Sequence, residues 1–345
     1  MGKYILVTDT HIGVKYGSSL YHNVTKRLFA TIFDYATHNK IDKLIHLGDF
    51  WDNRKTVSIK TILTGLSVID NINKVFKETY LIIGNHDTIY KDSIEDTLLT
   101  MFLKYENVSV IKEPTYIHNI LLLPWMFSPE ILENEKKVDI CMGHFDINGC
   151  VMNEAGSRAE NKHLSQSDFK KFKLVLSGHY HTPETYNNIR YLGSPFHTSF
   201  NDVAGTRGFY VLDNESCELE FIEFTDYPKY IRVKDTDNPE KIASLVPNNI
   251  VELIFTKDYG LNGNIELVER VKNLNPLTLM PKYVMMKEIM SHNDNSEQRE
   301  QEVEVKDHLG LLQEYYGCSE LPEYINVSVL NEITKKIYEE VTNGK

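Results

Sequence analysis

The sequence predicts an α/β protein, because short β-branched runs alternate with longer helical patterns from about residue 3 to residue 223. Several of these runs end directly in Gly, Asp or His, as strands do when their carboxyl ends border a ligand site. The 345 residues, 41% of them hydrophobic, are enough to bury a substantial core and favour more than one domain. We therefore expect a layered α/β domain followed by further structure.

Helical and strand patterns alternate through the first part of the chain. Apolar residues recur every four positions across residues 20–36, which predicts a helix packed on a sheet, and residues 56–73 predict a second such helix. Short apolar runs predict six strands, at residues 4–8, 43–47, 79–83, 121–123, 139–142 and 174–176. Three later runs have strand character with no helical period between them and predict an antiparallel part that closes the sheet system, at residues 185–192, 208–212 and 218–224.

The pattern restarts near residue 226 and predicts a small second α/β domain over residues 226–290, after a first domain of residues 1–225. The strands and helices of this second domain are expected at residues 230–233, 239–245, 250–256, 264–273 and 283–289, with 239–245 and 264–273 helical.

Residues 291–304 are polar and charged and lack aromatic side chains, which is typical of a linker. Residues 305–345 then hold two short amphipathic helical patterns, one around Leu309 and one around Ile333. Two short helices beyond a linker have little core of their own to join. Their apolar faces could fold back on the body, or they could dock on a partner.

Composition restricts the compartment and the kind of partner. With 37 basic and 49 acidic residues the formal net charge is −12, so the surface as a whole repels nucleic acid, and any contact with a phosphate backbone must be local or carried by metal. The four cysteines form no CxxC pair, which argues against a disulfide framework and a thiolate zinc site. No signal peptide or membrane span is evident. We expect a cytoplasmic protein.

Metal-ligand residues follow five of the predicted strands. These motifs are Asp9-Thr10-His11, residues 48–52 (GDFWD), residues 84–87 (GNHD), Gly143-His144 and residues 178–181 (GHYH). Because ligands bind at the carboxyl ends of strands in open α/β sheets, the five loops are expected to converge. Their carboxylates, imidazoles and one amide suit two divalent metals of the manganese, iron or magnesium range better than structural zinc.

Each motif alone is also compatible with an ordinary turn that holds a hydrogen-bonded histidine. However, five of the 13 histidines fall in these motifs, in the order that one site requires. For the other histidines, surface or core packing is the preferred interpretation, with His197 less clear because its segment follows a strand.

The motif series from Asp9 to His181 resembles the calcineurin-like metallophosphoesterase superfamily. More closely, the chain resembles nuclease subunits of the SbcCD type, in the form that tailed phages encode to work with an SbcC-like ATPase. That likeness rests on GDFWDNRK (48–55), IGNHD (83–87), PWM (124–126), CMGHFDING (141–149), SGHYHT (177–182), RYLGSP (190–195) and RGFYVLD (207–213). It implies a four-layer α/β/β/α sandwich with a small α/β capping domain and a C-terminal helical tail.

Residue by residue, the resemblance implies two bound metal ions, most simply Mn²⁺, with Mg²⁺ as an alternative, and Asp49 shared between them. One ion would be held by Asp9, His11, Asp49 and His181, and the other by Asp49, Asn85, His144 and His179. His86 would stabilise charge on the phosphate and help protonate the leaving oxygen, and Asp52 would orient His86. Many cellular relatives carry His at the Asp52 position, so this chain departs from the family there.

Several basic residues near the metal motifs are candidate contacts to the phosphate backbone of DNA. They are Lys15, Arg54, Lys55, Arg158, Lys162 and Arg207. Isolated surface lysines and arginines usually serve solubility, and for Lys170, Lys171 and Lys173 that interpretation is preferred.

The resemblance implies a 3′ to 5′ exonuclease on duplex ends and an endonuclease on single strands or hairpins, acting in recombination, repair and recombination-dependent replication. It also implies that residues 305–342 dock on the SbcC-like ATPase and that the chain forms a homodimer through helices such as 56–73 and 98–105. Alternatives are a small-molecule phosphodiesterase or protein phosphatase of the same superfamily, or a noncatalytic scaffold for the ATPase.

Overall fold

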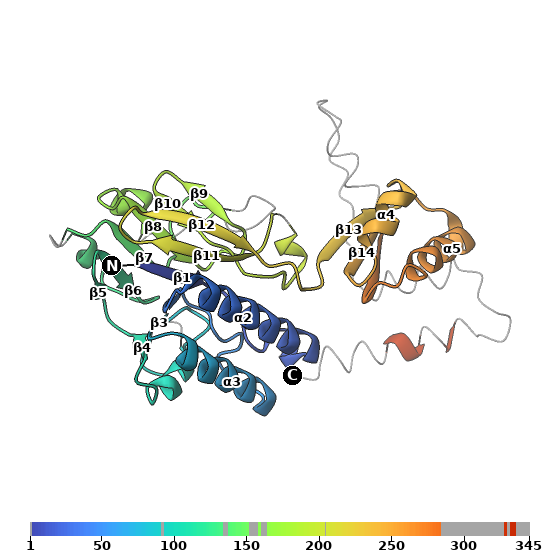
Figure 1. The fold of residues 1–345 in the computed structure, drawn as a ribbon. Helices are drawn as coiled ribbons and strands as arrows, with labels where there is room; N and C mark the ends of the chain where they lie inside the picture. The colour runs from blue at the N-terminus through green and yellow to red at the C-terminus, as the bar shows by residue number, and fades with distance from the viewer. Residues whose placement is uncertain are drawn as a thin grey trace, which may run out of the picture. The chain divides into compact units, whose positions relative to one another are not determined.

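The computed structural model describes residues 2–90, 93–133, 137–151, 158–159, 164–203, 205–283, 328–329 and 332–335. The main body contains two six-stranded sheets, and helices cover the outer side of the first (Figure 1). This arrangement confirms the predicted α/β class.

The first sheet has the strand order β12-β11-β1-β2-β3-β4. Its strands are β1 (Lys3–Val7), β2 (Lys43–His46), β3 (Glu78–Ile82), β4 (Val108–Ile111), β11 (Gly208–Asp213) and β12 (Glu218–Glu223). β1 to β4 are parallel, and β11 and β12 add the antiparallel part that the sequence predicts. Strand β4 was not predicted, because Ser109 interrupts its short apolar run.

The second sheet has the order β5-β6-β7-β8-β10-β9. Its strands are β5 (Thr115–Ile117), β6 (Ile120–Leu123), β7 (Ile140–His144), β8 (Leu174–Gly178), β9 (Glu184–Tyr186) and β10 (Ile189–Tyr191). The central strands are parallel, and β5 and β9 pair antiparallel at the two edges. The single strand expected at 185–192 is instead the β9–β10 hairpin, because Asn187 turns the chain with a φ of 52°.

The layers are held together by apolar side chains on both faces of the sheets. Helices α2 (Ser19–Asn39) and α3 (Ile59–Val75) pack on the outer face of the first sheet, as predicted, and lie next to each other in Figure 1. A second core fills the space between the sheets, where Leu6 and Ile45 accompany Met142 and Leu176. Each such side chain, once fully buried, contributes roughly 1.5–3 kcal/mol to folding.

The outer face of the second sheet is covered by loops and by the short 3₁₀ helices η2 (Pro129–Leu132) and η3 (Gln166–Phe169). Three further short elements lie in loops of the body: α1 (Val14–Gly17), η1 (Leu98–Phe102) and η4 (Phe200–Asp202).

Residues 230–283 form a separate three-stranded parallel sheet, with the order β13-β14-β15 and a core of its own. Its elements are β13 (Tyr230–Lys234), α4 (Pro239–Leu245), β14 (Ile250–Phe255), α5 (Gly260–Lys272) and β15 (Thr278–Tyr283). The third strand precedes the predicted 283–289, because Pro281 argues against a strand in sequence but is tolerated at a sheet edge. Residues 284–289 lie outside the described residues, and the domain limits 1–225 and 226–290 remain a proposal.

The predicted linker at 291–304 and most of the predicted tail at 305–345 also lie outside the described residues. The described residues 328–329 and 332–335 are helical. Among the helices that the structure describes, none is long and apolar enough to cross a membrane.

Candidate metal centre

The two sheets bring the five predicted motifs together at the carboxyl ends of their parallel strands. Loops after β1, β2 and β3 contribute residues from the first sheet, and β7 and the loop after β8 contribute residues from the second. Contacts of the described side chains join the residues Asp9, His11, Asp49, Asp52, Asn85, His86, His144, His179 and His181.

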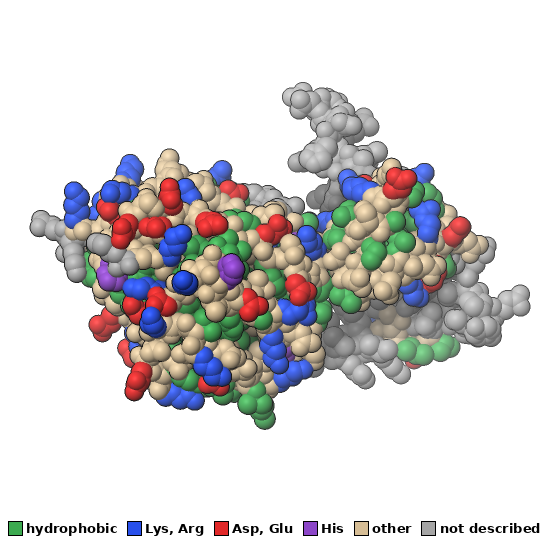
Figure 2. Space-filling model, viewed as in Figure 1, with side chains coloured by type: hydrophobic (Ala, Val, Ile, Leu, Met, Phe, Trp, Pro, Cys, Tyr) green, Lys and Arg blue, Asp and Glu red, His purple; other side chains and the backbone are tan. Residues whose placement is uncertain are grey.

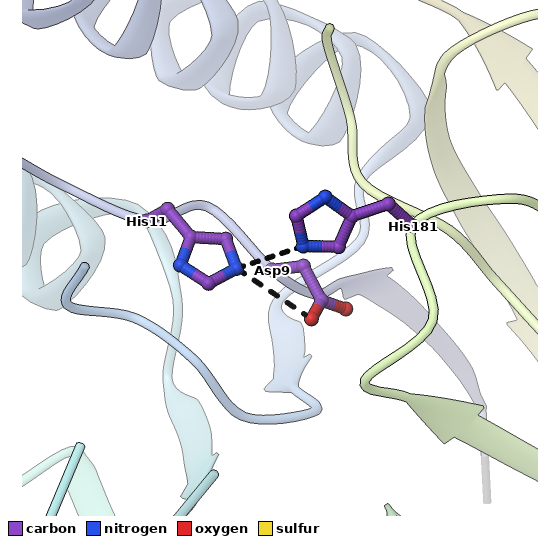
Figure 3. Close-up of side chains that lie close together, drawn as sticks. All are labelled: Asp9, His11 and His181. Atoms are coloured by element: carbon purple, nitrogen blue, oxygen red, sulfur yellow. Dashed lines mark hydrogen bonds and ion pairs between the residues drawn. The ribbon is translucent and has the colours of Figure 1, made fainter. Parts of the chain in front are cut away.

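A first group consists of Asp9, His11 and His181 (Figure 3). The Nε2 atoms of the two histidines lie 3.0 Å apart, and His11 Nε2 lies 3.9 Å from a carboxylate oxygen of Asp9. Figure 3 shows the imidazole nitrogens and the carboxylate pointing toward one another, although His181 comes from the other sheet.

A second group consists of Asp49, Asn85, His144 and His179. The side-chain oxygen of Asn85 lies 3.0 Å from His144 Nε2 and 2.9 Å from His179 Nδ1. Asp49 Oδ2 lies 3.3 Å from His144 Nε2 and 3.7 Å from His11 Nε2. The Asp49 carboxylate therefore lies between the two groups.

The donor set fits hard or borderline divalent cations. Nitrogen and oxygen atoms converge from both sides, and the three free cysteines among the described residues are not part of either group. Two ring nitrogens facing each other beside buried carboxylates are a natural arrangement for ligands of a shared cation. The residues present thus suit manganese, iron or magnesium better than a thiolate zinc site.

Four of these residues have left-handed backbone conformations, which L-amino acids rarely adopt. Their φ angles are 50° for Asp9, 41° for His11, 54° for Asp49 and 90° for His179. Each such conformation costs on the order of 1–3 kcal/mol and persists only where the surroundings fix it. Here the Asp9 and His11 amides donate to the Gly48 and Asp49 carbonyls at 3.0 and 3.1 Å. Strain concentrated in this way is typical of functional sites.

Two glycines allow the loops to approach this closely. A Cβ on Gly84 would lie 2.3 Å from the Asp49 amide nitrogen, and a Cβ on Gly48 would lie 2.4 Å from His144 Nδ1. Gly48 also has a φ of 98°, which favours glycine. The glycines of the GD and GN motifs are therefore required by the close packing of the ligand side chains.

Comparison with known proteins fits this geometry. Residues 2–183 match the family model described as calcineurin-like phosphoesterase, which is more than half of the chain. The chain belongs to the calcineurin-like phosphoesterase family. This finding confirms the superfamily that the motif series predicts, and proteins of this family use divalent metals.

Two nucleases are similar in sequence to this phosphoesterase. It is 29% identical over 330 residues to exonuclease subunit 1 of Enterobacteria phage T4, covering 92% of each chain. It is 33% identical over 91 residues to the SbcD component of the SbcCD nuclease of Staphylococcus epidermidis, covering 25% of this chain and 24% of that protein.

Solved structures also resemble the chain. A dimetal phosphatase from Danio rerio has a TM-score of 0.39 at 11% identity, covering 61% of this chain and 91% of that one. The phosphoesterase Yfce from E. coli has a TM-score of 0.31 at 15% identity, covering 61% and 88%.

Electrostatics divide the histidines of the phosphoesterase site into two kinds. Burial lowers the pKa of His11 and of His144, but the carboxylates of Asp52 and Asp49 outweigh it and raise both pKa values to about 9. For His179, burial and the neighbouring His144 lower the pKa to about 3. Asp49 itself is buried, yet His144 and His11 hold its pKa well below the usual range.

The pair His86 and Asp52 has a geometry that the sequence did not indicate. His86 Nδ1 lies 2.6 Å from the main-chain carbonyl of Asp52, and the Asp52 carboxylate instead lies 3.5 Å from His11 Nδ1. Burial lowers the pKa of His86, partly opposed by Asp49. The main chain at position 52 is therefore what faces the His86 ring, and the Asp52 side chain joins His11.

Asp87 has a role that the sequence did not indicate, although it lies in the GNHD motif. Asp87 is buried and accepts hydrogen bonds from the amides of Trp51 and Gly84, at 3.0 and 2.9 Å. It thereby ties the loop after β2 to the loop after β3. Burial, followed by the charge of Asp49, raises its pKa to about 7.

The candidate DNA contacts divide by exposure. Lys15 and Lys55 are exposed, Arg54 is half-buried, and Arg158 is exposed and donates to the Gly149 carbonyl at 2.6 Å. Lys162 lies outside the described residues. On the face seen in Figure 2, basic and acidic side chains of the described residues are interspersed.

The prediction that Arg207 contacts DNA is wrong. Only 1% of its surface is exposed, and its guanidinium donates to the main-chain carbonyls of His181 and Asp202. A cation enclosed in this way cannot reach a phosphate backbone. In the sequence, Arg207 follows a turn, and the neighbouring residues do not distinguish a buried arginine from an exposed one.

A cavity of about 720 Å³ opens beside the site of this phosphoesterase. It is lined by residues that include Gly13, Lys15, Tyr16, Asp52, Ser58 and Thr61. Tyr16 is fully exposed. The volume of the cavity is in the range of ligand pockets. Asp52 belongs both to the lining of the cavity and to the ligand cluster.

Proposed function

We propose that this phosphoesterase is a dinuclear-metal DNA nuclease, a 3′ to 5′ exonuclease on duplex ends and an endonuclease on single strands or hairpins. The observation that carries the proposal is the ligand cluster centred on Asp49, in a chain that aligns over 92% of its length with an exonuclease subunit. Its biological setting would be the processing of DNA ends in recombination, repair and recombination-dependent replication.

In this proposal Asp9, His11, Asp49 and His181 hold one metal, and Asp49, Asn85, His144 and His179 hold the other. The carboxylate of Asp49 is shared, in keeping with its position between the two groups. A bound metal pair supplies positive charge to the phosphate oxygens and lowers the pKa of a water molecule. The net charge of −12 would then be no obstacle to DNA, because two bound divalent ions would outweigh the charge of the Asp9 and Asp49 carboxylates.

His86 would act on the leaving side of the phosphodiester. Its Nδ1 is placed to donate to the Asp52 carbonyl, which leaves Nε2 free to face the substrate. The ring centroids of His86 and His11 lie 4.8 Å apart, so His86 borders the ligand cluster. Burial keeps the free ring neutral, and a phosphodiester next to Nε2 would favour the protonated form that can give its proton to the leaving oxygen.

The proposal extends to substrate contacts and partners. Lys15, Arg54, Lys55 and Arg158 would contact phosphates, and Lys15 lines the cavity beside the site. The exposed Ile59 and Leu63 on α3 would belong to a homodimer interface. Residues 305–342 would dock on an SbcC-like ATPase, and 226–290 would cap the cleft. Such a complex would work in the host cytoplasm.

The direct test is manganese-dependent digestion of end-labelled linear DNA, with and without the coiled-coil ATPase. We expect progressive release of label from 3′ ends, and none after chelation of the metal. A cyclic nucleotide and a phosphoprotein serve as competing substrates. Turnover of either of these without turnover of DNA would contradict the proposal, and complete inactivity of the reconstituted complex on all three would favour a scaffold.

Metal binding should release protons. Because the pKa values of His11 and His144 are raised to about 9, both rings carry a proton near pH 7 in the metal-free protein, whereas a metal ligand must be neutral. We expect about two protons released at pH 7 and fewer as the pH rises through 9, with metal affinity increasing over that range. Titration calorimetry in buffers of different ionisation enthalpy measures this number, and no proton release at pH 7 would contradict the prediction.

A further inference from the structure

The loop that precedes β11 holds a buried carboxylate next to His181 of the ligand cluster. Asp202, at the end of η4, is 2% exposed. Its Oδ2 atom accepts hydrogen bonds from the Thr198 amide and hydroxyl, each at 2.7 Å, and from the Ser199 amide at 2.9 Å. These bonds fix the carboxylate within its own loop.

The other carboxylate oxygen faces a different partner. Asp202 Oδ1 lies 3.3 Å from Nδ1 of His181, and the Nε2 atom of the same ring lies 3.0 Å from His11 Nε2. The imidazole of His181 is therefore placed between a buried carboxylate on one side and the candidate metal site on the other. A cap for the η4 turn needs only Oδ2, so the position of Oδ1 is not explained by capping.

Arg207 connects the main chain at the two ends of this contact. Its guanidinium donates to the carbonyl of His181 and to the carbonyl of Asp202. Because the guanidinium is planar and rigid, two donors from one group fix the spacing of the two carbonyls. Arg207 is therefore too buried to contact DNA, but it holds the main chain of His181 and of Asp202 at a fixed spacing.

We infer that Asp202 is a positioning residue for His181, held in register by Arg207, and that it keeps the proton of the His181 ring on Nδ1. The inference rests on the proposed function, in which His181 is a metal ligand. A carboxylate that accepts from Nδ1–H leaves the Nε2 lone pair free and directs it into the site. Partners of this kind typically change metal affinity 10–100-fold when they are replaced.

The test is the substitution Asp202→Asn. The amide is nearly isosteric, so its oxygen can retain the loop bonds of Oδ2 while its NH₂ group faces His181 Nδ1. A donor at that position opposes Nδ1–H and forces the proton onto Nε2, where it blocks metal binding. We expect a 10–100-fold loss of Mn²⁺ affinity for one of the two sites, measured by titration calorimetry.

Nitrogen NMR of the metal-free, ¹⁵N-histidine-labelled protein gives a second measurement that requires neither metal nor DNA. We expect His181 to be protonated on Nδ1 in the natural protein and on Nε2 in Asp202→Asn. Asn201→Ala, which changes an exposed side chain of the same turn and keeps its main-chain amide, serves as the matched control and should keep the natural tautomer and affinity.

The outcomes separate the inference from the proposed function. A proton on Nε2 of His181 in the natural protein overturns the inference, whether or not Asp202→Asn folds. Unchanged Mn²⁺ affinity in a folded Asp202→Asn protein overturns it as well. Conversely, a protein that shows the expected tautomer and binds metal but leaves DNA intact refutes the nuclease proposal alone.

Discussion

Replacing Asp49 with asparagine should abolish the metal pair and lower DNA cleavage by about 10³-fold or more. The substitution keeps the size of the side chain but removes the charge that lies within 3.7 Å of His11 Nε2 and 3.3 Å of His144 Nε2. Loss of the charge stabilisation that metals provide to a phosphoryl group is worth several kcal/mol, and each 1.36 kcal/mol is a factor of ten in rate.

Metal content by mass spectrometry and the rate on labelled DNA measure this effect. Asp34→Asn, at an exposed position of α2, is the matched control and should retain both. Asp49→Asn that binds two ions and cleaves at the natural rate would contradict the shared-ligand role. Anomalous scattering from manganese-soaked crystals of the natural protein provides a direct view, with two neighbouring ions expected beside Asp49.

Replacing His86 with alanine should separate metal binding from chemistry. His86 has no ligand role in the proposal, so metal content should remain nearly unchanged, while the turnover number falls by roughly 10²–10⁴-fold, the usual contribution of a general acid. The Michaelis constant should change little, because the loss affects proton transfer rather than the binding of the DNA backbone.

Two comparison variants make the His86 result specific. His38→Gln, at an exposed position near the end of α2, should behave as the natural protein. Asp52→Asn keeps the main-chain carbonyl that lies 2.6 Å from His86 Nδ1 but loses the carboxylate charge that lies 3.5 Å from His11 Nδ1, so it should weaken metal binding, which His86→Ala leaves nearly unchanged. Full cleavage by His86→Ala would refute its role, and loss of metal would place it among the ligands.

The sheets and the ligand loops were predictable from sequence because their signals are local. Strands such as β1 and β8 are short apolar runs that end in a Gly, Asp or His motif, and the stripe of α2 repeats every four residues. Once parallel strands are recognised, the meeting of their carboxyl ends follows from topology alone. That is why residues as distant in sequence as His11 and His181 could be assigned to one place.

The features that sequence missed depend on tertiary contacts. Nothing around Arg207 shows that its guanidinium will be enclosed, and Asp202 looks in sequence like a cap of its own turn. Whether the side chain or the main chain of Asp52 contacts the His86 ring also depends on the conformation of the loop, which the identity of the residue does not reveal. Strand β15 was placed too late in the sequence because it contains Pro281, and a strand tolerates proline only at the edge of a sheet.

The division of the ligand cluster between the two sheets has a mechanical consequence. The first sheet and its loops supply Asp9, His11, Asp49 and Asn85, and the second sheet and its loops supply His144, His179 and His181. An ion bound by residues of both sets would therefore hold the two sheets together. Folding and cofactor loading are then thermodynamically linked, since occupancy favours the closed sandwich over any state in which the layers part. The side chains that would hold the ions for catalysis would thus also stabilise the packing of the two sheets against each other.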